Sequence, residues 1–401
     1  MIRQFSLEAW GVRSYELSAA DAAALQASGL VRAELDPAPG NYRLRAGSHI
    51  GVAAGPDWEL RVESHLDVRN LMFLLCYARD PDGWKDALAT FGDSKDLLSS
   101  TAWGFAAAAE RALLRGLLRG YRQLEERSPV LRGRLRVEAQ MAGGGLPMPL
   151  DIVHDEYDID TPENRMVLAA TQLLRRLPLT HPLARQRLRR LVSQLDGVTQ
   201  VRDHRQLRIP AITRLNQHYQ PALILADIVL RAMALRADSG RSRSVTFSFE
   251  LHRVFEQFLA VALTASLGRS GARLSEQVTG RTLDRERMLR LRPDLVVWKG
   301  GHCHAVIDAK FKRLEQDIGG DAYQLLAYLL EFGPPRGFLV SAQGKASEHT
   351  VCAVAKQLSV RPVNLDQEPD GVLRTTDALA AELLSLGLPH SHAHPVKGSA
   401  A

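Results

Sequence analysis

The clearest hydrophobic pattern in the chain is a helical one shortly after residue 248. Within the segment 249–267, apolar residues recur every three or four positions, which places them on one face of a helix. They are Leu251, Val254, Phe255, Phe258, Leu259 and Ala262. Glu256 lies at the edge of this stripe. The pattern predicts an amphipathic helix with one carboxylate at the margin of its buried face.

Two short apolar runs follow, and each adjoins a carboxylate. Asp294 comes directly before the run 295–298, and the run 304–307 ends in Asp308-Ala309-Lys310. The residues between the runs, 299–302, include two glycines and predict a turn. If the chain reverses there, Asp294 lies across from Asp308 or one position away. Asp308 and Lys310 are two residues apart, so on a strand they face the same side.

This arrangement predicts a metal site for phosphodiester cleavage. Carboxylate oxygens suit Mg²⁺ or Mn²⁺, so Asp294 and Asp308 are the expected ligands, with Glu256 as a further ligand or base. Lys310 would offset negative charge on the phosphate. Each piece alone has an ordinary explanation, such as a turn or a surface ion pair. Their combination beside buried apolar residues favours the functional interpretation, because charges at such positions are costly unless paired or metal-bound.

A second helical pattern covers residues 321–330 and carries two polar side chains one turn apart. Gln324 and Tyr328 share one helix face, where they can position a DNA backbone or order the metal ligands. The alternative is that both residues form the rim of the core.

The rest of the chain contains further predicted elements. Residues 58–63 alternate between apolar and polar, as in a strand, and the segment 66–78 predicts a short helix. Helices are also expected over 100–122, 162–177, 182–195 and 222–236. Residues 131–137 resemble a strand, and the acidic stretch 155–162 resembles a turn.

These elements predict an α+β protein of several domains. We expect a β-rich N-terminal module over residues 1–95, a mainly helical middle region over 96–240 and an α/β nuclease core over 241–388. The tail 389–401 is expected to be disordered. Its alternating His390, His392 and His394 are more typical of a frayed end than of a metal site.

Composition narrows the class of protein. The chain has 401 residues, a net charge of +6 and a pI of about 9.3, which is compatible with a polyanionic partner. An arginine cluster over residues 185–190 can contact phosphates or simply form a solvated helix face. Three widely spaced cysteines argue against a disulfide framework or a zinc site. Without a long apolar run, we expect a cytoplasmic protein with no membrane contact.

The motifs resemble those of the PD-(D/E)XK nuclease superfamily. Pro293-Asp294 and Asp308-Ala309-Lys310 match its signature, and Gln324 to Tyr328 match the QxxxY element of its RecB-like branch. Within that branch the chain resembles the McrC family, the nuclease subunits of McrBC-type modification-dependent restriction systems. Further similar stretches are residues 70–78, 131–135, 156–165 and 255–256.

The resemblance implies a specific activity. McrC-like proteins are Mg-dependent endonucleases that cut DNA together with McrB, an AAA+ ring that hydrolyses GTP and recognises modified cytosine. Their N-terminal region docks on the ring and stimulates hydrolysis. This sequence has no Walker A motif, so the GTPase would be a separate chain. Two alternatives remain. One is a standalone or differently partnered nuclease of another defence or repair system, and the other is a non-cutting activator of an AAA+ ring.

Overall fold

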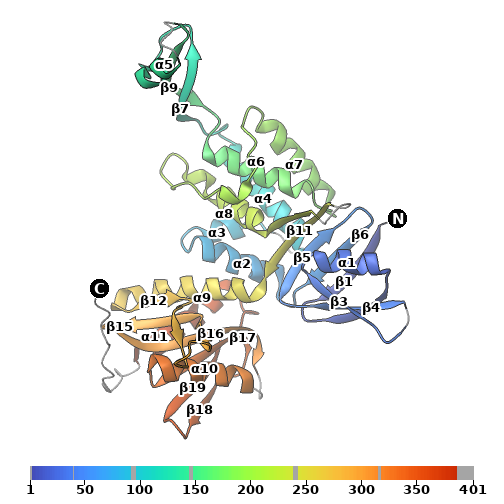
Figure 1. Ribbon diagram of the computed structural model, residues 1–401, viewed down its shortest axis with the longest axis vertical. Helices are drawn as coiled ribbons and strands as arrows, with labels where there is room; N and C mark the ends of the chain where they lie inside the picture. Colours follow the sequence, from blue (N-terminus) through green and yellow to red (C-terminus); the bar gives the residue numbers. More distant parts are fainter. Residues whose placement is uncertain are drawn as a thin grey trace. The chain divides into compact units, whose positions relative to one another are not determined.

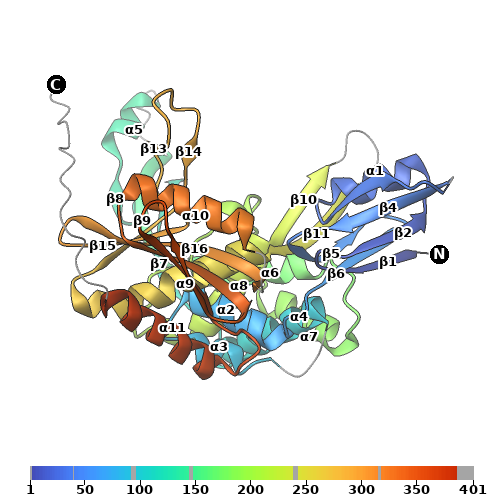
Figure 2. The ribbon, with the colours of Figure 1, turned by 90° about the horizontal axis from the view of Figure 1, so that it is seen from below.

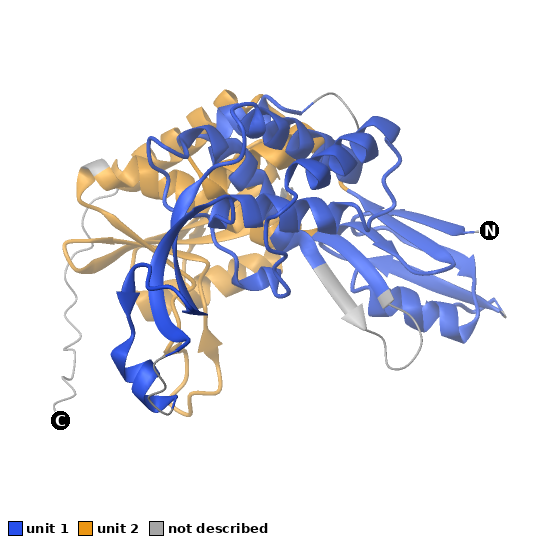
Figure 3. Cartoon of the chain, turned by 90° about the horizontal axis from the view of Figure 1, so that it is seen from above, with its two compact units in different colours: residues 1–63, 82–248 blue, residues 64–81, 249–401 orange. Residues whose placement is uncertain are grey.

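The computed structural model describes residues 2–38, 40–91, 96–143, 148–237, 243–314 and 318–385. The expected tail with its three histidines lies outside the described residues, as does the Gly144-Gly145 pair. The described chain is a mixed α+β protein with several sheets, as expected at that level. It forms two compact units, residues 1–63 with 82–248 and residues 64–81 with 249–401 (Figure 3). No helix among the described residues is long and apolar enough to cross a membrane.

The first unit begins with two sheets. Strands β1, β6, β5, β11 and β10 form one sheet in that order, and β2, β4 and β3 form the other. The bounds are β1 (Arg3–Glu8), β2 (Val12–Glu16), α1 (Ala19–Ala27), β3 (Val31–Leu35), β4 (Asn41–Ala46), β5 (His49–Ala54), β6 (Trp58–Glu63), β10 (Met233–Ala237) and β11 (Arg243–Glu250). Gly51 has a φ of +136°, and a Cβ there would lie 2.0 Å from the Phe247 carbonyl oxygen. Only glycine allows β5 and β11 to approach this closely.

Helices form the middle of the first unit. They are α3 (Trp84–Leu88), α4 (Leu97–Leu113), α6 (Pro162–Leu174), α7 (Pro182–Gln194) and α8 (Gln220–Ala232), with short 3₁₀ turns at His204–Gln206 and Gln217–Tyr219. The Thr161 hydroxyl accepts from the Asn164 N–H and caps α6. In the arginine cluster, Arg187 lies over the Trp103 ring at 3.9 Å and Arg185 donates to the Leu179 carbonyl. These contacts favour a packing role for the cluster.

Two predicted helices of this region were too long. The helix expected over 100–122 ends at Leu113, and the strand β7 (Gly120–Ser128) begins after a short connection. The helix expected over 222–236 ends at Ala232, where β10 starts. In both cases the residues beyond the helix pair with a later strand, β7 with β9 and β10 with β11. The periodicity of apolar residues within one segment cannot reveal such strand pairing.

A separate arm of the first unit consists of β7, β8 (Arg134–Leu135), α5 (Val137–Ala142) and β9 (Leu150–Asp158). The turn expected over 155–162 is confined to residues 159–161, because β9 continues to Asp158, which pairs with Gly120. The strand expected over 131–137 shortens to β8. Figure 1 shows the arm extending away from α6 of the same unit. We call residues 120–143 and 148–158 the arm.

The second unit is built on a six-stranded mixed sheet in the order β12-β15-β16-β17-β19-β18. Its elements are α2 (Val68–Arg79), α9 (Leu251–Leu267), η3 (Gly268–Ser270), β12 (Arg273–Glu276), β13 (Arg281–Thr282), β14 (Arg290–Leu291), β15 (Leu295–Lys299), β16 (His302–Leu314), α10 (Gly319–Phe332), β17 (Arg336–Gly344), β18 (Ser347–Val351), β19 (Lys356–Pro362) and α11 (Pro369–Ser385). The apolar stripe predicted for α9 is buried throughout.

Helix α2 belongs to this second unit, although it follows the N-terminal strands in sequence. Phe73 and Tyr77 of α2 pack edge-to-face against Phe258 of α9, with ring centroids 5.4 and 5.5 Å apart. Asn70 donates to the carbonyls of Leu365 and Gln367. The compact units therefore differ from the expected module 1–95, since these contacts join residues almost 300 positions apart.

The two faces of the sheet are covered by different helices. Val306 of β16 belongs to one core cluster with Leu325 and Leu329 of α10. Phe311 of the same strand packs edge-to-face on Phe255 of α9, with ring centroids 6.0 Å apart. Because neighbouring strand residues point to opposite faces, Asp308 and Lys310 share the α10 face with Val306.

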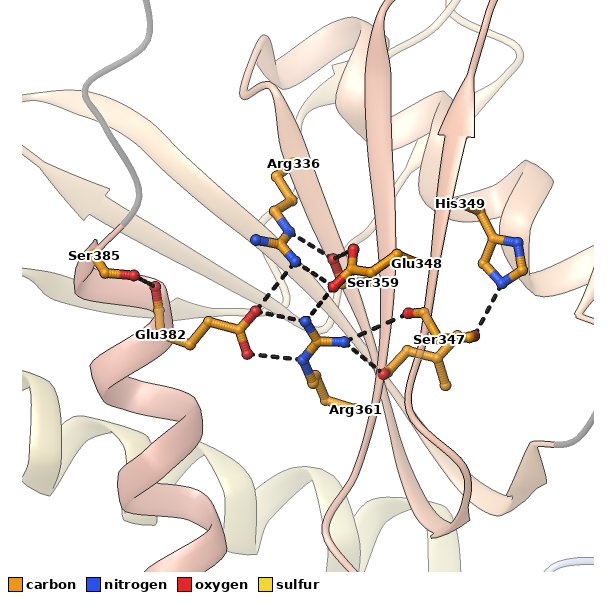
Figure 4. A network of polar contacts seen from close by, with 9 residues as sticks. Arg336, Ser347, Glu348, His349, Ser359, Arg361, Glu382 and Ser385 are labelled. Atoms are coloured by element: carbon orange, nitrogen blue, oxygen red, sulfur yellow. Dashed lines mark hydrogen bonds and ion pairs between the residues drawn. The ribbon is translucent and has the colours of Figure 1, made fainter.

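On β17, β18 and β19, an ion-pair network ties the sheet to α11 (Figure 4). Arg361 donates to both oxygens of Glu382, each at 2.7 Å, and also contacts Glu348. Arg336 reaches Glu348, Glu382 and the Ser359 hydroxyl. The Ser359 hydroxyl in turn donates to Glu348 at 2.8 Å. Each charge in this network therefore faces opposite charges.

Candidate active site at the end of the β15–β16 hairpin

The two carboxylates predicted to meet do lie side by side. Leu295 pairs with Ile307 across the hairpin, so Asp294 lies at the position opposite Asp308. The Asp294 Oδ2 accepts a hydrogen bond of 2.8 Å from the Ala309 N–H. This bond fixes the Asp294 carboxylate against the strand that carries Asp308. The predicted hairpin register is confirmed.

Lys310 stands beside this carboxylate pair. Its Nζ lies 2.8 Å from Oδ2 of Asp308 and 3.6 Å from Oδ1 of Asp321, a residue in the first turn of α10. It also donates to Oε1 of Gln324 at 3.2 Å. One ammonium thus connects the strand β16 with the helix α10.

The remaining predicted residues join the site through a chain of hydrogen bonds. Gln324 Nε2 donates to the Tyr328 hydroxyl at 2.8 Å, so the two share a helix face as predicted. The Tyr328 hydroxyl donates to the Arg292 carbonyl at 3.1 Å. Both side chains are therefore oriented by polar contacts at the site, although Tyr328 also belongs to the core cluster.

Glu256 connects to the same chain from the α9 side. Gln277, whose φ is +43°, donates from Nε2 to Oε2 of Glu256 at 3.2 Å. The Oε1 of Gln277 accepts from the guanidinium of Arg292. The contact between Glu256 and the hairpin is thus bridged by an amide, and the backbone N–H of Gln277 further binds the Asp294 carbonyl at 2.7 Å.

Burial and mutual repulsion make this site electrostatically unfavourable for carboxylates. Burial raises the pKa of Asp294 to about 6, against the hydrogen bond from Ala309, and the charge of Glu256 adds to the rise. Burial, followed by the charge of Asp294, raises the pKa of Asp308 to about 6. Burial likewise raises the pKa of Glu256. For Lys310, burial alone would lower the pKa, but the charge of Asp308 raises it overall.

The donor set fits a hard divalent cation at two carboxylates. Oδ2 of Asp308 is buried and, apart from its ion pair with Lys310, receives no hydrogen bond of normal geometry from the described residues. Oxygen ligands and excess negative charge are what Mg²⁺ and Mn²⁺ require. No three acidic, histidine or cysteine side chains in the described ranges are placed together as a metal cluster. The fit therefore extends to Asp294 and Asp308, and Glu256 stands apart from them.

Sequence reasoning overlooked three residues of the site. Asp321 lies three positions before Gln324 on α10, a spacing that predicts the same helix face. Gln277 has no local signal, because its partners Glu256 and Arg292 lie far from it in sequence. Ser341 pairs with Lys310 in the register of β16 and β17. Its buried hydroxyl has no hydrogen-bond partner among the described residues.

Comparison with known families identifies the chain. Residues 44–341 match the family model described as a McrBC 5-methylcytosine restriction system component. The chain belongs to this family. No curated protein matches the sequence of this McrBC-family chain.

Solved structures match this McrBC-family chain at low sequence identity. One match is a chain of the refined half-complex from the tetradecameric assembly of Thermococcus gammatolerans McrB AAA+ hexamers with bound McrC. It is 17% identical with a TM-score of 0.59, and the match covers 94% of this chain and 100% of that one. Another is a chain of the cryo-EM structure of the Thermococcus gammatolerans McrBC complex. It is 17% identical with a TM-score of 0.42, and the match covers 70% of this chain and 90% of that one.

Proposed function

We propose that this chain is a metal-dependent DNA endonuclease subunit that works with an AAA+ GTPase on a separate chain, in a restriction system directed at modified cytosine. The observation that carries the proposal is the meeting of Asp294, Asp308 and Lys310 at the end of a buried hairpin. Family membership supports it, since the family is that of 5-methylcytosine restriction components.

The order of elements around the hairpin supports a PD-(D/E)XK core. Helix α9 precedes β12, the hairpin β15–β16 carries the Pro-Asp and Asp-Ala-Lys motifs, and α10 returns over the sheet to the parallel strand β17. The motif residues emerge on the face that α10 covers. Buried strands on both sides hold them rigidly, which is the support that a catalytic constellation needs.

Each site residue then has a role. Asp294 and Asp308 would hold Mg²⁺ or Mn²⁺, and the bound ion would activate water and stabilise charge on the phosphate. Lys310 is placed to bind a phosphate oxygen and offset its growing negative charge. Gln324 orients Lys310 and is itself held by Tyr328, and the two would present an amide and a hydroxyl to the DNA backbone. Glu256, which Gln277 holds on the side of α9, stands apart from the two carboxylates and would act as a base rather than as a ligand.

Partner contact is assigned to the first unit, and the arm carries the supporting observation. Seven large apolar side chains of the arm are exposed, each by at least half. They are Tyr121 (79%), Val130 (65%), Leu131 (57%), Val137 (56%), Met141 (71%), Met148 (50%) and Tyr157 (54%). Such a concentration of exposed apolar side chains is typical of a protein–protein contact. The solved structure most relevant to this assignment pairs McrB AAA+ hexamers with McrC.

One experiment separates the two assignments by measuring two activities on the same variants. Asp308→Asn should lower DNA cleavage by about 10³-fold or more, because the carboxylate that holds the cation is lost. Its stimulation of GTP hydrolysis by an McrB-like partner should stay unchanged. Replacement of Val130, Leu131 and Met141 by serine should abolish the stimulation of GTP hydrolysis, while the metal site stays intact.

Controls and contrary outcomes are defined by the same assays. Asp366→Asn removes an exposed carboxylate bonded to Gln343 and should leave both activities unchanged. Cleavage should vanish with a chelator and return with Mg²⁺ or Mn²⁺. Full cleavage by a folded Asp308→Asn chain would refute the nuclease assignment. Normal stimulation by the serine variant of the arm would refute the partner assignment.

A further inference from the structure

A basic hairpin directly precedes the candidate active site in the sequence. Strands β13 and β14 pair antiparallel, Arg281 with Leu291 and Thr282 with Arg290. Five of the twelve residues from 281 to 292 are arginine, against two acidic residues. We call residues 281–292 the arginine hairpin. Figure 2 shows it as a narrow ribbon extending beyond the sheet beside α10 of the same unit.

The tip of the arginine hairpin has a defined conformation. The Asp284 carboxylate accepts from the backbone N–H groups of Met288 (3.0 Å) and Leu289 (2.8 Å). Arg287 adopts a φ of +59° within this turn. Backbone strain of this kind persists only where the surroundings fix it, and it is often associated with function. The tip is therefore a preformed projection.

The arginines at the base of the arginine hairpin bind residues of the site, whereas those in its middle have no counter-charge in contact among the described residues. Arg281 pairs with Glu331 of α10 at 3.2 Å, and Arg292 binds Gln277. In contrast, Arg285, Arg287 and Arg290 are exposed. None of these three makes an ion pair or side-chain hydrogen bond with any residue that the structure describes. Three guanidinium groups are thus available for an anionic ligand.

Apolar side chains accompany these arginines at the tip. Met288 is 79% exposed, Leu289 57% and Leu283 42%. Exposed apolar groups next to arginines suit the groove of a nucleic acid duplex, where guanidinium groups bind phosphates and apolar side chains pack on base edges or between base steps. A two-stranded ribbon also has dimensions that a major groove about 12 Å wide admits.

The position of the arginine hairpin selects DNA over other anionic surfaces. Arg290 lies four residues before Asp294, so the two Cα atoms are at most about 14 Å apart. A duplex that places a phosphate at Asp294 and Asp308 must pass beside the hairpin. We infer that the arginine hairpin inserts into a groove of the DNA duplex next to the cut phosphate, with Arg285, Arg287 and Arg290 on phosphates and Met288 and Leu289 against the bases. This inference rests on the proposed DNA cleavage.

Duplex binding by the full-length chain tests the inference independently of cleavage. All variants are made in the Asp308→Asn background, and the affinity for a labelled duplex containing 5-methylcytosine is measured across a range of salt concentrations. Combined alanine replacement of Arg285, Arg287 and Arg290 should lower affinity at least about tenfold. The slope of log affinity against log salt should flatten by about 2 to 3, because each phosphate contact contributes about 0.9.

The apolar tip predicts a different signature. Replacing Met288 and Leu289 by serine should lower affinity by about tenfold at an unchanged salt slope, since apolar contacts release no counterions. In the cleavage-competent chain it should also spread the cut positions. Arg374→Ala on α11 and Val354→Ser on the β18–β19 turn remove an exposed arginine and an exposed apolar side chain elsewhere in the unit. Both controls should bind as the background does, and unchanged melting temperatures show that all variants are folded.

Three outcomes overturn the inference. The first is an unchanged affinity and salt slope in the triple arginine variant, although the background binds DNA. The second is binding to phosphatidylserine vesicles that depends on the hairpin while duplex binding does not. The third is a background chain that binds no duplex. In each case cleavage by the wild-type chain reports separately on the proposed function, so the two failures remain distinguishable.

Discussion

Two polar clusters on the same sheet of the second unit differ in their balance of positive and negative charge. In the ion-pair network of Figure 4, two arginines face two glutamates, and each carboxylate contacts at least one guanidinium. In the candidate active site, Lys310 contacts Asp308 and Asp321, and Asp321 is also paired with Lys312, whereas Asp294 forms no ion pair among the described residues. The network is balanced, whereas the site carries excess negative charge.

The pKa values follow this difference. Burial acts to raise the pKa of Glu348, but hydrogen bonds from Arg361 and Ser359 outweigh it and hold that pKa below its ordinary value. At the site, burial raises the pKa of Asp294 and Asp308 to about 6. The charge of Glu256 adds to the rise at Asp294, and the charge of Asp294 adds to the rise at Asp308. Carboxylates with raised pKa values of this kind are typical of functional sites. The comparison separates a charge-balanced cluster that ties the sheet to α11 from a cluster whose excess negative charge supports the proposed cation site.

Removing a charge from the network should therefore affect stability and leave catalysis alone. Arg361→Ala should lower the free energy of unfolding by about 1–3 kcal/mol, because Glu382 and Glu348 both lose a charged donor. Arg361→Lys keeps the charge but not the two-pronged geometry and should lose part of this amount. Urea denaturation measures the change, with the exposed Arg374→Ala as the control.

Slower cleavage per folded molecule of Arg361→Ala would contradict the conclusion that the network affects stability alone. Cleavage should be measured at a temperature where every variant is fully folded, so that lost stability does not count as lost activity. Equal stability of the wild type and Arg361→Ala would show instead that the network contributes nothing to the fold.

The local parts of the site were predictable from sequence. Two glycines set the turn of the β15–β16 hairpin, and strand alternation then places Asp308 and Lys310 on one side. Gln324 and Tyr328 are neighbours because a helix makes residues four apart adjacent. In both cases the geometry depends on only a few successive residues.

The connections between elements were not predictable, because they depend on distant residues. Gln277 bridges Glu256 and Arg292 across 21 and 15 positions. Helix α2 joins the second unit through Phe258, whose sequence distance from Phe73 exceeds 180 residues. The arm was missed for the same reason, since β7 and β9 stabilise each other as strands although each has a polar, weakly patterned sequence. Tertiary pairing overrides local propensity in these segments.

Gln324 tests whether a polar residue of the candidate active site acts on cleavage rather than on stability. Gln324→Ala removes the hydrogen bond that orients Lys310 and the one donated to Tyr328. Cleavage should fall by about tenfold, equivalent to one charged hydrogen bond, and much less than in Asp308→Asn. The melting temperature should stay normal. Tyr328→Phe is the matched variant, because it removes only the hydroxyl and leaves the core ring in place.

A purely structural role for this helix face gives a different result. If Gln324 only completes the core, Gln324→Ala will melt at a lower temperature and cleave normally per folded molecule. Measuring both quantities on the same preparation distinguishes the two roles.

The smallest expected effect concerns the pH dependence of the network. Because the pKa of Glu348 is lowered in the fold, its ionised form stabilises the native state. That contribution is fully present above the ordinary glutamate value of about 4.5 and is lost as the pH falls through the lower folded value. Glu348 is half-exposed, so solvent screening limits the contribution to less than about 1 kcal/mol. Glu348→Gln lacks it at every pH. The difference in unfolding free energy between the wild type and this variant should therefore shrink from about pH 6 to about pH 3, while the exposed Glu368→Gln shows no such trend. A difference that stays constant over this range would mean that Glu348 is not held by its arginines in solution, and the contrast with the carboxylates of the active site would then be one of burial alone.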